Sequence, residues 1–228
     1  MQVTIHGTAL SPWVRRLFLV CEEKGIEYDI VNVVPFGDPD PEFLKVSPLG
    51  KVPVLEFEGK HLPDSLAASV FLESLAAAPQ LFPIDGWQRA WMLWLCDYLT
   101  TGLFAKVEVP LFIQRFVNPN FFQKGTDQAV VDRALGLLPQ HFDYLEGQLS
   151  PNKAFLASDA ISLADLTAGS IFVNMRHARE PVNAERWPLL SAYVERLHAR
   201  PSFTKVLERE STTVGRISPL FAEAAIHP

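Results

Sequence analysis

Residues 52–65 read VPVLEFEGKHLPDS and predict two short strands followed by the start of a helix. The segment 52–57 has strand composition, and Glu58-Gly59 is a tight-turn signal that leads into a second strand at 60–62. Two strands joined by such a turn run antiparallel. Asp64-Ser65 then caps a helix that extends to about residue 77. This stretch therefore predicts a ββα unit.

The chain before this unit predicts a strand, a helix and a second strand. Alternating residues place the first strand near residues 3–5, and Ser11-Pro12 opens a helix whose apolar residues recur at helical spacing. Gly25 ends that helix, and residues 28–34 form the second strand. A strand–helix–strand segment of this length implies a right-handed crossover and a parallel pair. The amino-terminal part is thus a βαβ–ββα domain.

The chain after this unit reads as helix almost throughout. Amphipathic stretches are expected at 87–117, 126–149, 162–178, 187–198 and 202–211, with Pro110 kinking or splitting the first of them. Residues 78–86 hold two prolines and read as a linker. The predicted organisation is α/β plus all-α: an amino-terminal domain over 1–77, the linker at 78–86, and an all-helical domain over 87–228.

Composition narrows the classes of partner. The 228 residues are 48% hydrophobic and 20% charged, and the formal net charge is −6. A net negative charge disfavours binding to nucleic acid or to anionic membranes, because both bind clustered Lys and Arg side chains. Its apolar runs are too short to span a bilayer, and its first residues do not resemble a leader peptide. We expect a cytoplasmic protein in which Cys21 and Cys96 are reduced core residues.

Three short motifs have both a structural and a functional interpretation. Ser11 is a preferred helix cap, but its hydroxyl also lies at a helix N-terminus that favours an anion. Pro53 suits the start of an edge strand, whereas a cis Val52–Pro53 bond would expose the backbone of Val52 to an extended ligand. Asp64-Ser65 caps a helix, and the same pair offers a carboxylate to an amine and a hydroxyl to a carboxylate.

Taken in order, these motifs resemble the glutathione S-transferase family, in which a thioredoxin-like domain precedes an all-helical domain. The resemblance covers nearly the whole chain. In the helical part, Ser162 and Asp165 have the spacing of a reciprocal helix cap. The segments that carry the resemblance are 11–16 (SPWVRR), 23–28 (EKGIEY), 47–55 (SPLGKVPVL), Asp64-Ser65 and 161–165 (ISLAD).

The resemblance implies a role for each matching residue. Ser11 would hydrogen-bond the sulfur of glutathione, and Val52, before an expected cis Pro53, would pair its backbone with the cysteinyl part. Ser65 would hold the γ-glutamyl carboxylate with Asp64 near the amine, and Lys51 or Lys45 would reach the glycyl carboxylate. Asp64 departs from the family's usual Glu or Gln and is one methylene shorter, which weakens the expected recognition of the γ-glutamyl group.

The second substrate would lie in an apolar pocket between the domains. Aromatic stripes at helical spacing are usually core, so each candidate also has a plain structural interpretation. His6 is expected to be a wall or core residue, and no metal site is expected because the six histidines do not share a face. The candidate pocket residues are Trp13, Phe36, Phe104, Val107, Phe112 and Phe116.

Three functions follow from the resemblance. The first is a glutathione S-transferase of the detoxification type, which activates reduced glutathione to attack small hydrophobic electrophiles. The second is a glutathione-dependent thiol–disulfide oxidoreductase, which Ser11 disfavours because a mixed disulfide needs a protein sulfur. The third is a non-catalytic glutathione-binding protein. Glutathione would be a co-substrate, no metal is needed, and a homodimer is expected.

Overall fold

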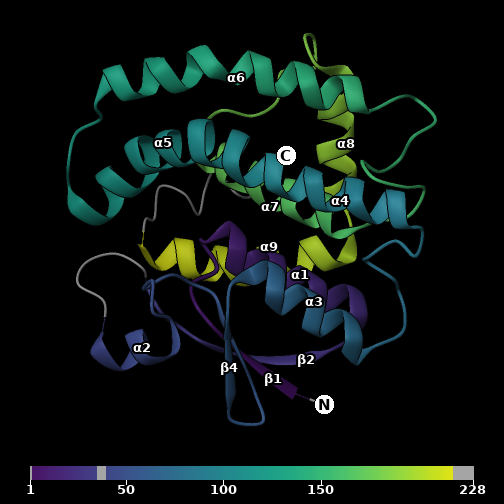
Figure 1. The fold of residues 1–228 in the computed structure, drawn as a ribbon. Helices are drawn as coiled ribbons and strands as arrows, with labels where there is room; N and C mark the ends of the chain where they lie inside the picture. The colour runs from purple at the N-terminus through teal and green to yellow at the C-terminus, as the bar shows by residue number, and fades with distance from the viewer. Residues whose placement is uncertain (1, 35–39, 218–228) are drawn as a thin grey trace.

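The computed structural model describes residues 2–34 and 40–217. Its amino-terminal part is a four-stranded sheet with the order β2-β1-β3-β4, built from β1 (Gln2–His6), β2 (Glu27–Val31), β3 (Val54–Phe57) and β4 (Lys60–Pro63) (Figure 1). β1 and β2 are parallel, while β3 runs antiparallel to both β1 and β4. The predicted parallel crossover and hairpin are confirmed.

Local chemistry sets the boundaries of these elements. α1 (Pro12–Lys24) begins with proline at its first turn and ends at Gly25, whose φ of 64° is the left-handed conformation that glycine adopts without strain. The hairpin turn has positive φ at both central residues, Glu58 at 51° and Gly59 at 73°. That combination matches the right-handed twist of the flanking strands. Two further helices, α2 (Pro41–Val46) and α3 (Ser65–Leu75), complete this part.

The remainder of the described chain is helical. One continuous run comprises α4 (Gly86–Tyr98), η1 (Leu99–Glu108), α5 (Val109–Phe112) and η2 (Ile113–Phe122). In η1 and η2 the helix has wide turns with i→i+5 hydrogen bonds. After these come α6 (Gln128–Gln148), α7 (Leu163–His177), α8 (Pro188–His198) and α9 (Pro201–Ile217). The sequence predicts that Pro110 kinks or splits this run; the split is wrong, because the chain stays helical through Pro110, and the kink stays a prediction.

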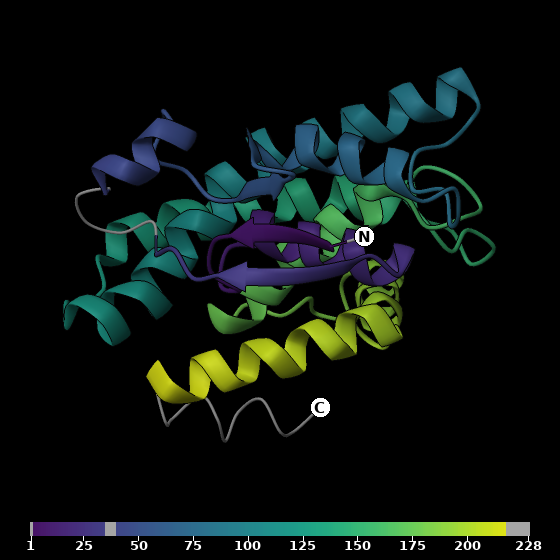
Figure 2. The same ribbon diagram turned by 90° about the horizontal axis from the view of Figure 1, so that it is seen from below.

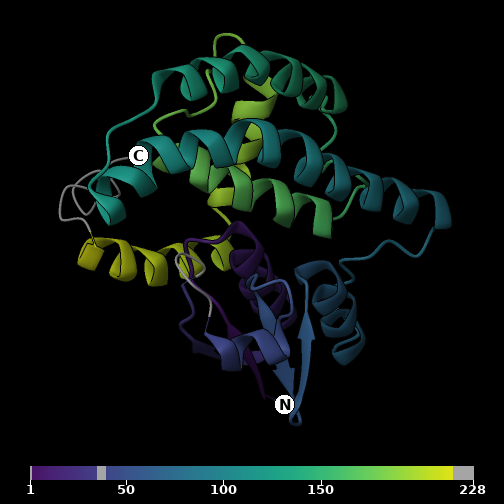
Figure 3. The same ribbon diagram turned by 60° about the vertical axis from the view of Figure 1, so that its left-hand side comes forward.

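The two parts share one hydrophobic core. α1 lies between α3, on the sheet side, and α7 of the helical part (Figure 1). α9 also contacts α1 and runs along the amino-terminal part (Figure 2), while the remaining helices stack above it (Figure 3). α7 starts at the predicted cap, where the Asp165 carboxylate accepts hydrogen bonds from the Ser162 N–H and hydroxyl at 2.8 and 2.7 Å. Because α1 contacts α3, α7 and α9, it holds the amino-terminal sheet against the helical part.

Within the described residues, no helix combines the length and the apolar character needed to cross a membrane.

Candidate functional site

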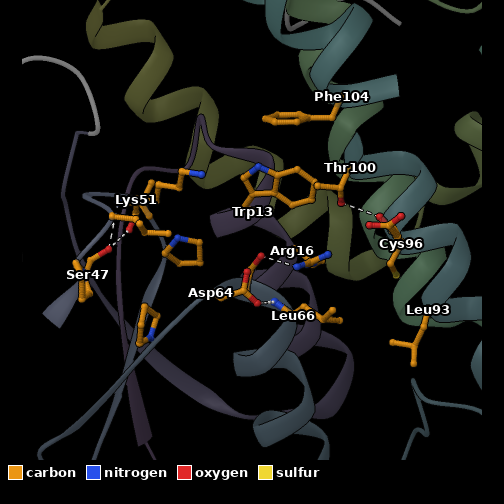
Figure 4. Close-up of a pocket in the computed structure, with 17 residues that line it drawn as sticks. Trp13, Arg16, Ser47, Lys51, Asp64, Leu66, Leu93, Cys96, Thr100 and Phe104 are labelled. Atoms are coloured by element: carbon orange, nitrogen blue, oxygen red, sulfur yellow. Dashed lines mark hydrogen bonds between the residues drawn. The ribbon is translucent and has the colours of Figure 1, made fainter. Parts of the chain in front are cut away.

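A cavity of about 600 Å³ lies between the two parts of the molecule (Figure 4). The amino-terminal part contributes one wall and α4 with η1 contributes the other. The lining residues are Trp13, Arg16, Ser47, Pro48, Leu49, Lys51, Val52, Pro53, Pro63, Asp64, Ser65 and Leu66 from the first, and Leu93, Cys96, Asp97, Thr100 and Phe104 from the second.

The loop that leads into β3 supplies a backbone edge to this cavity. The Ser47 hydroxyl donates to the Lys51 carbonyl at 2.7 Å and accepts from the Lys51 N–H at 3.1 Å. This pair of bonds closes the loop before Val52, and the Val52–Pro53 peptide bond is cis. Lys51, Val52 and Pro53 all line the cavity. The loop therefore presents one cation and a short extended backbone to a ligand.

The N-terminus of α3 also opens onto the cavity. Asp64 has a φ of 79°, and its Oδ1 accepts hydrogen bonds from the N–H groups of Leu66 and Ala67 at 2.8 and 2.9 Å. Capping thus occupies one carboxylate oxygen of the exposed Asp64. Ser65, the first residue of α3, is buried beside it. A helix N-terminus favours a negatively charged group through its dipole and its free N–H groups.

Arg16 places a buried positive charge on the same wall. Its guanidinium donates to the hydroxyls of Ser65 at 2.5 Å and Thr167 at 3.2 Å, and it lies 5.1 Å from the ring centre of Trp13. Its Nε has no partner among the described residues. Burial lowers the pKa of Arg16, and the nearby charges of Cys96 and Asp64 oppose this only in part. Burying a charge is costly unless it is paired, so this cation is complementary to an incoming anion.

The opposite side of the cavity carries aromatic and aliphatic side chains together with the polar Asp97 and Thr100. Trp13 and Phe104 make an edge-to-face contact with ring centres 4.6 Å apart, which joins α1 to η1 across the domain boundary. Leu93 and Thr100 continue this wall along α4 and η1 (Figure 4). The cavity thus combines an anion-binding corner with an aromatic wall. Such a site suits a small ligand that has carboxylates at one end and an apolar group at the other.

The chain also has relatives among known proteins. The glutathione S-transferase N-terminal domain family matches residues 10–75, and the glutathione S-transferase C-terminal domain family matches residues 104–201. Glutathione S-transferase 3 of Zea mays is 30% identical over 209 residues, which cover 89% of this chain and 92% of the relative. The chain belongs to the glutathione S-transferase family. The predicted family, fold and transferase class are therefore confirmed.

Other members of the family show the same likeness. Probable glutathione S-transferase GSTF1 of Oryza sativa is 28% identical over 208 residues, covering 90% of this chain and 94% of the relative. A glutathione S-transferase structure from Rhodospirillum rubrum F11 shares the fold with a TM-score of 0.82 and 24% identity, covering 90% of this chain and 91% of that one.

Of the residues that the resemblance assigns to glutathione, five meet at the cavity, whereas Lys45 and Ser11 do not. Lys51, Val52, Pro53, Asp64 and Ser65 meet at the cavity although they come from two segments of the chain. Lys45, the other candidate for the glycyl carboxylate, instead pairs with Glu42 at 2.7 Å on the surface of α2.

Ser11, the predicted catalytic residue, also lies outside the cavity lining. It precedes α1 and is not among the residues that line the cavity, whereas Trp13, two residues later, is. The Ser11 hydroxyl makes no capping hydrogen bond to α1, so the helix does not use it.

The expected apolar pocket is only partly correct. Trp13 and Phe104 line the cavity, but Val107, Phe112 and Phe116 are buried in the core instead. Phe112 and Phe116 stack in a small separate cluster beside Leu10. The wide turns of η1 rotate the helix away from the ordinary 3.6-residue period, so residues after Phe104 do not stay on its face. Phe36 lies outside the described residues.

The sequence reasoning missed Arg16, Cys96, Asp97 and Thr100. Arg16 had one available signal, since it lies three residues after Trp13 and therefore on the same side of α1. The residues of α4 and η1 had none, because only the tertiary fold brings these helices to the cavity.

The expectation that the histidines do not share a face is wrong for His6 and His61. His6 and His61 lie on one sheet face with Glu56, and their ligand atoms fall within 4.8 Å of one another. Strand pairing brings them together from positions far apart in the sequence.

Proposed function

We propose that this chain is a glutathione transferase that binds reduced glutathione in the interdomain cavity and activates its thiol for attack on small hydrophobic electrophiles. The observation that carries the proposal is the buried Arg16 guanidinium, which has hydroxyl partners but no carboxylate partner among the described residues. A γ-glutamyl carboxylate placed there would receive a charge-assisted hydrogen bond.

The Ser65 hydroxyl supports this placement. Because its oxygen already accepts a hydrogen bond from Arg16, its proton is free to be donated to a carboxylate. The N-terminus of α3 adds its dipole at the same point. The free oxygen of Asp64 would take the ammonium of the γ-glutamyl group. Lys51 would pair with the glycyl carboxylate, and the backbone of Val52 would pair with the cysteinyl part.

Activation of the thiol follows from simple arithmetic. A free thiol with a pKa near 8.5 is only about 3% ionised at pH 7, and lowering the pKa by two units raises this to roughly 75%. Ser11 lies two residues before the cavity-lining Trp13, so the sulfur would have to extend past Trp13 to the N-terminus of α1. There a hydrogen bond from Ser11 would supply about 1.5–3 kcal/mol and the helix dipole about 0.3–1 kcal/mol. The thiol proton would pass to solvent, and the thiolate would attack the electrophilic carbon of a substrate held against Trp13 and Phe104. It would either displace a leaving group as its anion or add to an activated double bond whose other carbon takes a proton from water.

The two cysteines argue against an oxidoreductase that uses a protein thiol. Both are free and buried, and burial raises the pKa of Cys21 to about 12. Cys96 lines the cavity, yet it is only 2% exposed, and burial also raises its pKa. A mixed disulfide requires an accessible thiolate. Two free cysteines are consistent with the reducing cytoplasm that we propose as the location.

A direct test compares the wild type with Ser11→Ala and a matched surface variant, Ser74→Ala. We expect Ser11→Ala to raise the pKa of the bound thiol by about 1–2 units, which is the loss of one charge-assisted hydrogen bond. The thiolate absorbance of bound glutathione, followed against pH, measures this. An unchanged titration would remove Ser11 from the mechanism.

Calorimetric titration shows which form of glutathione binds. Tighter binding of glutathione disulfide than of reduced glutathione would favour the oxidoreductase, and no binding of either would overturn the proposal.

We also propose that the chain forms a homodimer, with the first domain of one subunit against the helical domain of the other. The support is a set of large apolar side chains exposed on α3, on α4 and between them: Val70, Ile84, Trp87, Leu93 and Trp94. Isolated apolar residues are normal on a surface, but several along two adjacent helices favour a partner. Sedimentation equilibrium should give twice the chain mass of 25.5 kDa, and the mass of a monomer would contradict the proposal.

A further inference from the structure

His6, Glu56 and His61 form a compact cluster on three adjacent strands of the sheet. Glu56 is on the middle strand, β3, with His6 on β1 to one side and His61 on β4 to the other. Glu56 pairs directly with His61 across the strands, and His6 pairs with Val54, two residues from Glu56 on the same face. The sheet itself therefore fixes the relative positions of the three side chains.

The cluster lies on the sheet face that points away from α1 and α3. Successive side chains of a strand point to opposite faces, and the neighbours of the cluster, Ile5 and Leu55, are buried in the shared core. The cluster side chains are 17% exposed for His6, 35% for Glu56 and 31% for His61. Water can therefore reach the cluster, and the cluster is separate from the core between the sheet and the helices.

The three donor atoms already converge. Glu56 Oε2 is 2.8 Å from His6 Nε2 and 3.6 Å from His61 Nε2, and the ligand atoms all lie within 4.8 Å. Zinc binds imidazole nitrogen and carboxylate oxygen at about 2.0–2.2 Å, so two ligands of a tetrahedral ion are roughly 3.3 Å apart. The observed separations lie on both sides of that value. Small side-chain rotations would bring all three onto one ion.

The charge of the cluster also suits a cation. Among the described residues, Glu56 forms no ion pair with a lysine or arginine, and the groups within ion-pair distance of its carboxylate are the imidazoles of His6 and His61. A carboxylate with two imidazoles is a donor set that late first-row divalent metals favour over magnesium or calcium, which prefer oxygen ligands. Three protein ligands also leave coordination positions for water.

We propose that His6, Glu56 and His61 bind one divalent transition-metal ion of the zinc type, with water completing its coordination. The ion would tie β1, β3 and β4 together on the sheet face opposite α1 and α3. Because the three residues converge only in the folded chain, the ion would stabilise the folded state. This site is independent of the proposed glutathione chemistry.

The test is a calorimetric titration of Zn²⁺ into tag-free, chelator-treated protein in a buffer without thiols, since a histidine tag or glutathione would itself bind the metal. We expect one Zn²⁺ per chain with micromolar or tighter affinity. His61→Ala and Glu56→Gln should each weaken it at least tenfold. Glu42→Gln, a matched change on the surface of α2, should leave it unchanged. Co²⁺ in place of Zn²⁺ should show the visible absorption bands of a cobalt ion bound by nitrogen and oxygen ligands. His61→Ala should abolish these bands.

Thermal unfolding supplies a second readout. Saturating Zn²⁺ should raise the Tm of the wild type and of Glu42→Gln, but not that of His61→Ala, whose substitution lies on the partly exposed edge hairpin. Mg²⁺ should produce no shift. Absence of Zn²⁺ binding by the wild type, or binding that survives both His61→Ala and Glu56→Gln, would overturn the proposal.

Discussion

Arg15 and Arg16 are adjacent on α1, and both are buried, but their surroundings differ. Every nitrogen of the Arg15 guanidinium has a partner: it donates to Glu210 at 2.8 Å, to the Ser170 carbonyl at 2.7 Å and to Asn174 at 3.0 Å. Glu210 is only 2% exposed. Arg15 therefore ties α1 to α7 and α9, and each of its three guanidinium nitrogens is engaged with a partner inside the protein.

Arg16 lies about 100° further around the helix and faces the cavity instead. Its partners are two hydroxyls and an aromatic ring, and one of its nitrogens has no partner among the described residues. Two neighbouring cations of the same type can thus have opposite roles. Arg15 joins parts of the fold, and Arg16 is the cation to which the proposed function assigns the ligand carboxylate.

The largest expected effect comes from Arg15→Met. Removing this cation leaves the Glu210 carboxylate buried without its main partner, which costs about 3–5 kcal/mol of unfolding free energy. Urea denaturation measures the loss, with Arg133→Met on the exposed face of α6 as the control. A loss below about 1 kcal/mol would show that the network is not what joins α1 to the helical part.

The next effect concerns Glu108, a buried carboxyl close to Arg15. Burial raises its pKa to about 8, and the nearby Asn174 and Arg15 lower it only in part. The folded pKa is above the unfolded value, so Glu108 favours the folded state fully below about pH 4.5 and loses this as the pH rises through 8. Arg15 does not restore the ordinary pKa of Glu108, because its guanidinium is already paired with Glu210.

Glu108→Gln tests this statement by removing the titration. Between pH 5 and pH 8 the wild type should lose about 2–4 kcal/mol of unfolding free energy relative to the variant. Urea denaturation at several pH values measures the difference, with the exposed Glu42→Gln as the control. Parallel pH profiles for the wild type and Glu108→Gln would mean that Glu108 is ionised in the folded protein, and that Arg15 is shared between two carboxylates.

The smallest of these free-energy changes is expected for Arg16→Met, and it should appear in binding. Losing a charge-assisted hydrogen bond to the γ-glutamyl carboxylate should cost about 1.5–3 kcal/mol, or roughly 10- to 100-fold in glutathione affinity. Unfolding free energy should change little, because no buried carboxylate is left unpaired. Calorimetry and urea denaturation on the same variant give both numbers, again with Arg133→Met as the control. Unchanged glutathione affinity with a large loss of unfolding free energy would contradict the prediction. It would mean that Arg16, like Arg15, stabilises the fold and does not bind the ligand.

The sequence by itself determined the elements and much of the glutathione side of the cavity. Local signals were sufficient there: Gly25 ends α1, Glu58-Gly59 makes the hairpin, and Asp64 caps α3. Each of these depends on the backbone preferences of a few consecutive residues. The motif around Val52 and the pair Asp64-Ser65 could therefore be assigned before any long-range contact was known.

Tertiary structure alone decided which side chains meet. Arg15 and Arg16 differ because α7 and α9 pack against one side of α1 while the other side opens to the cavity. Val107 lies in the core and not in the expected pocket, because η1 has wide turns that differ from the 3.6-residue period used for the prediction. His6, Glu56 and His61 converge because the strand order brings β1, β3 and β4 side by side. Contacts of this kind depend on packing between distant segments, which local preferences do not specify.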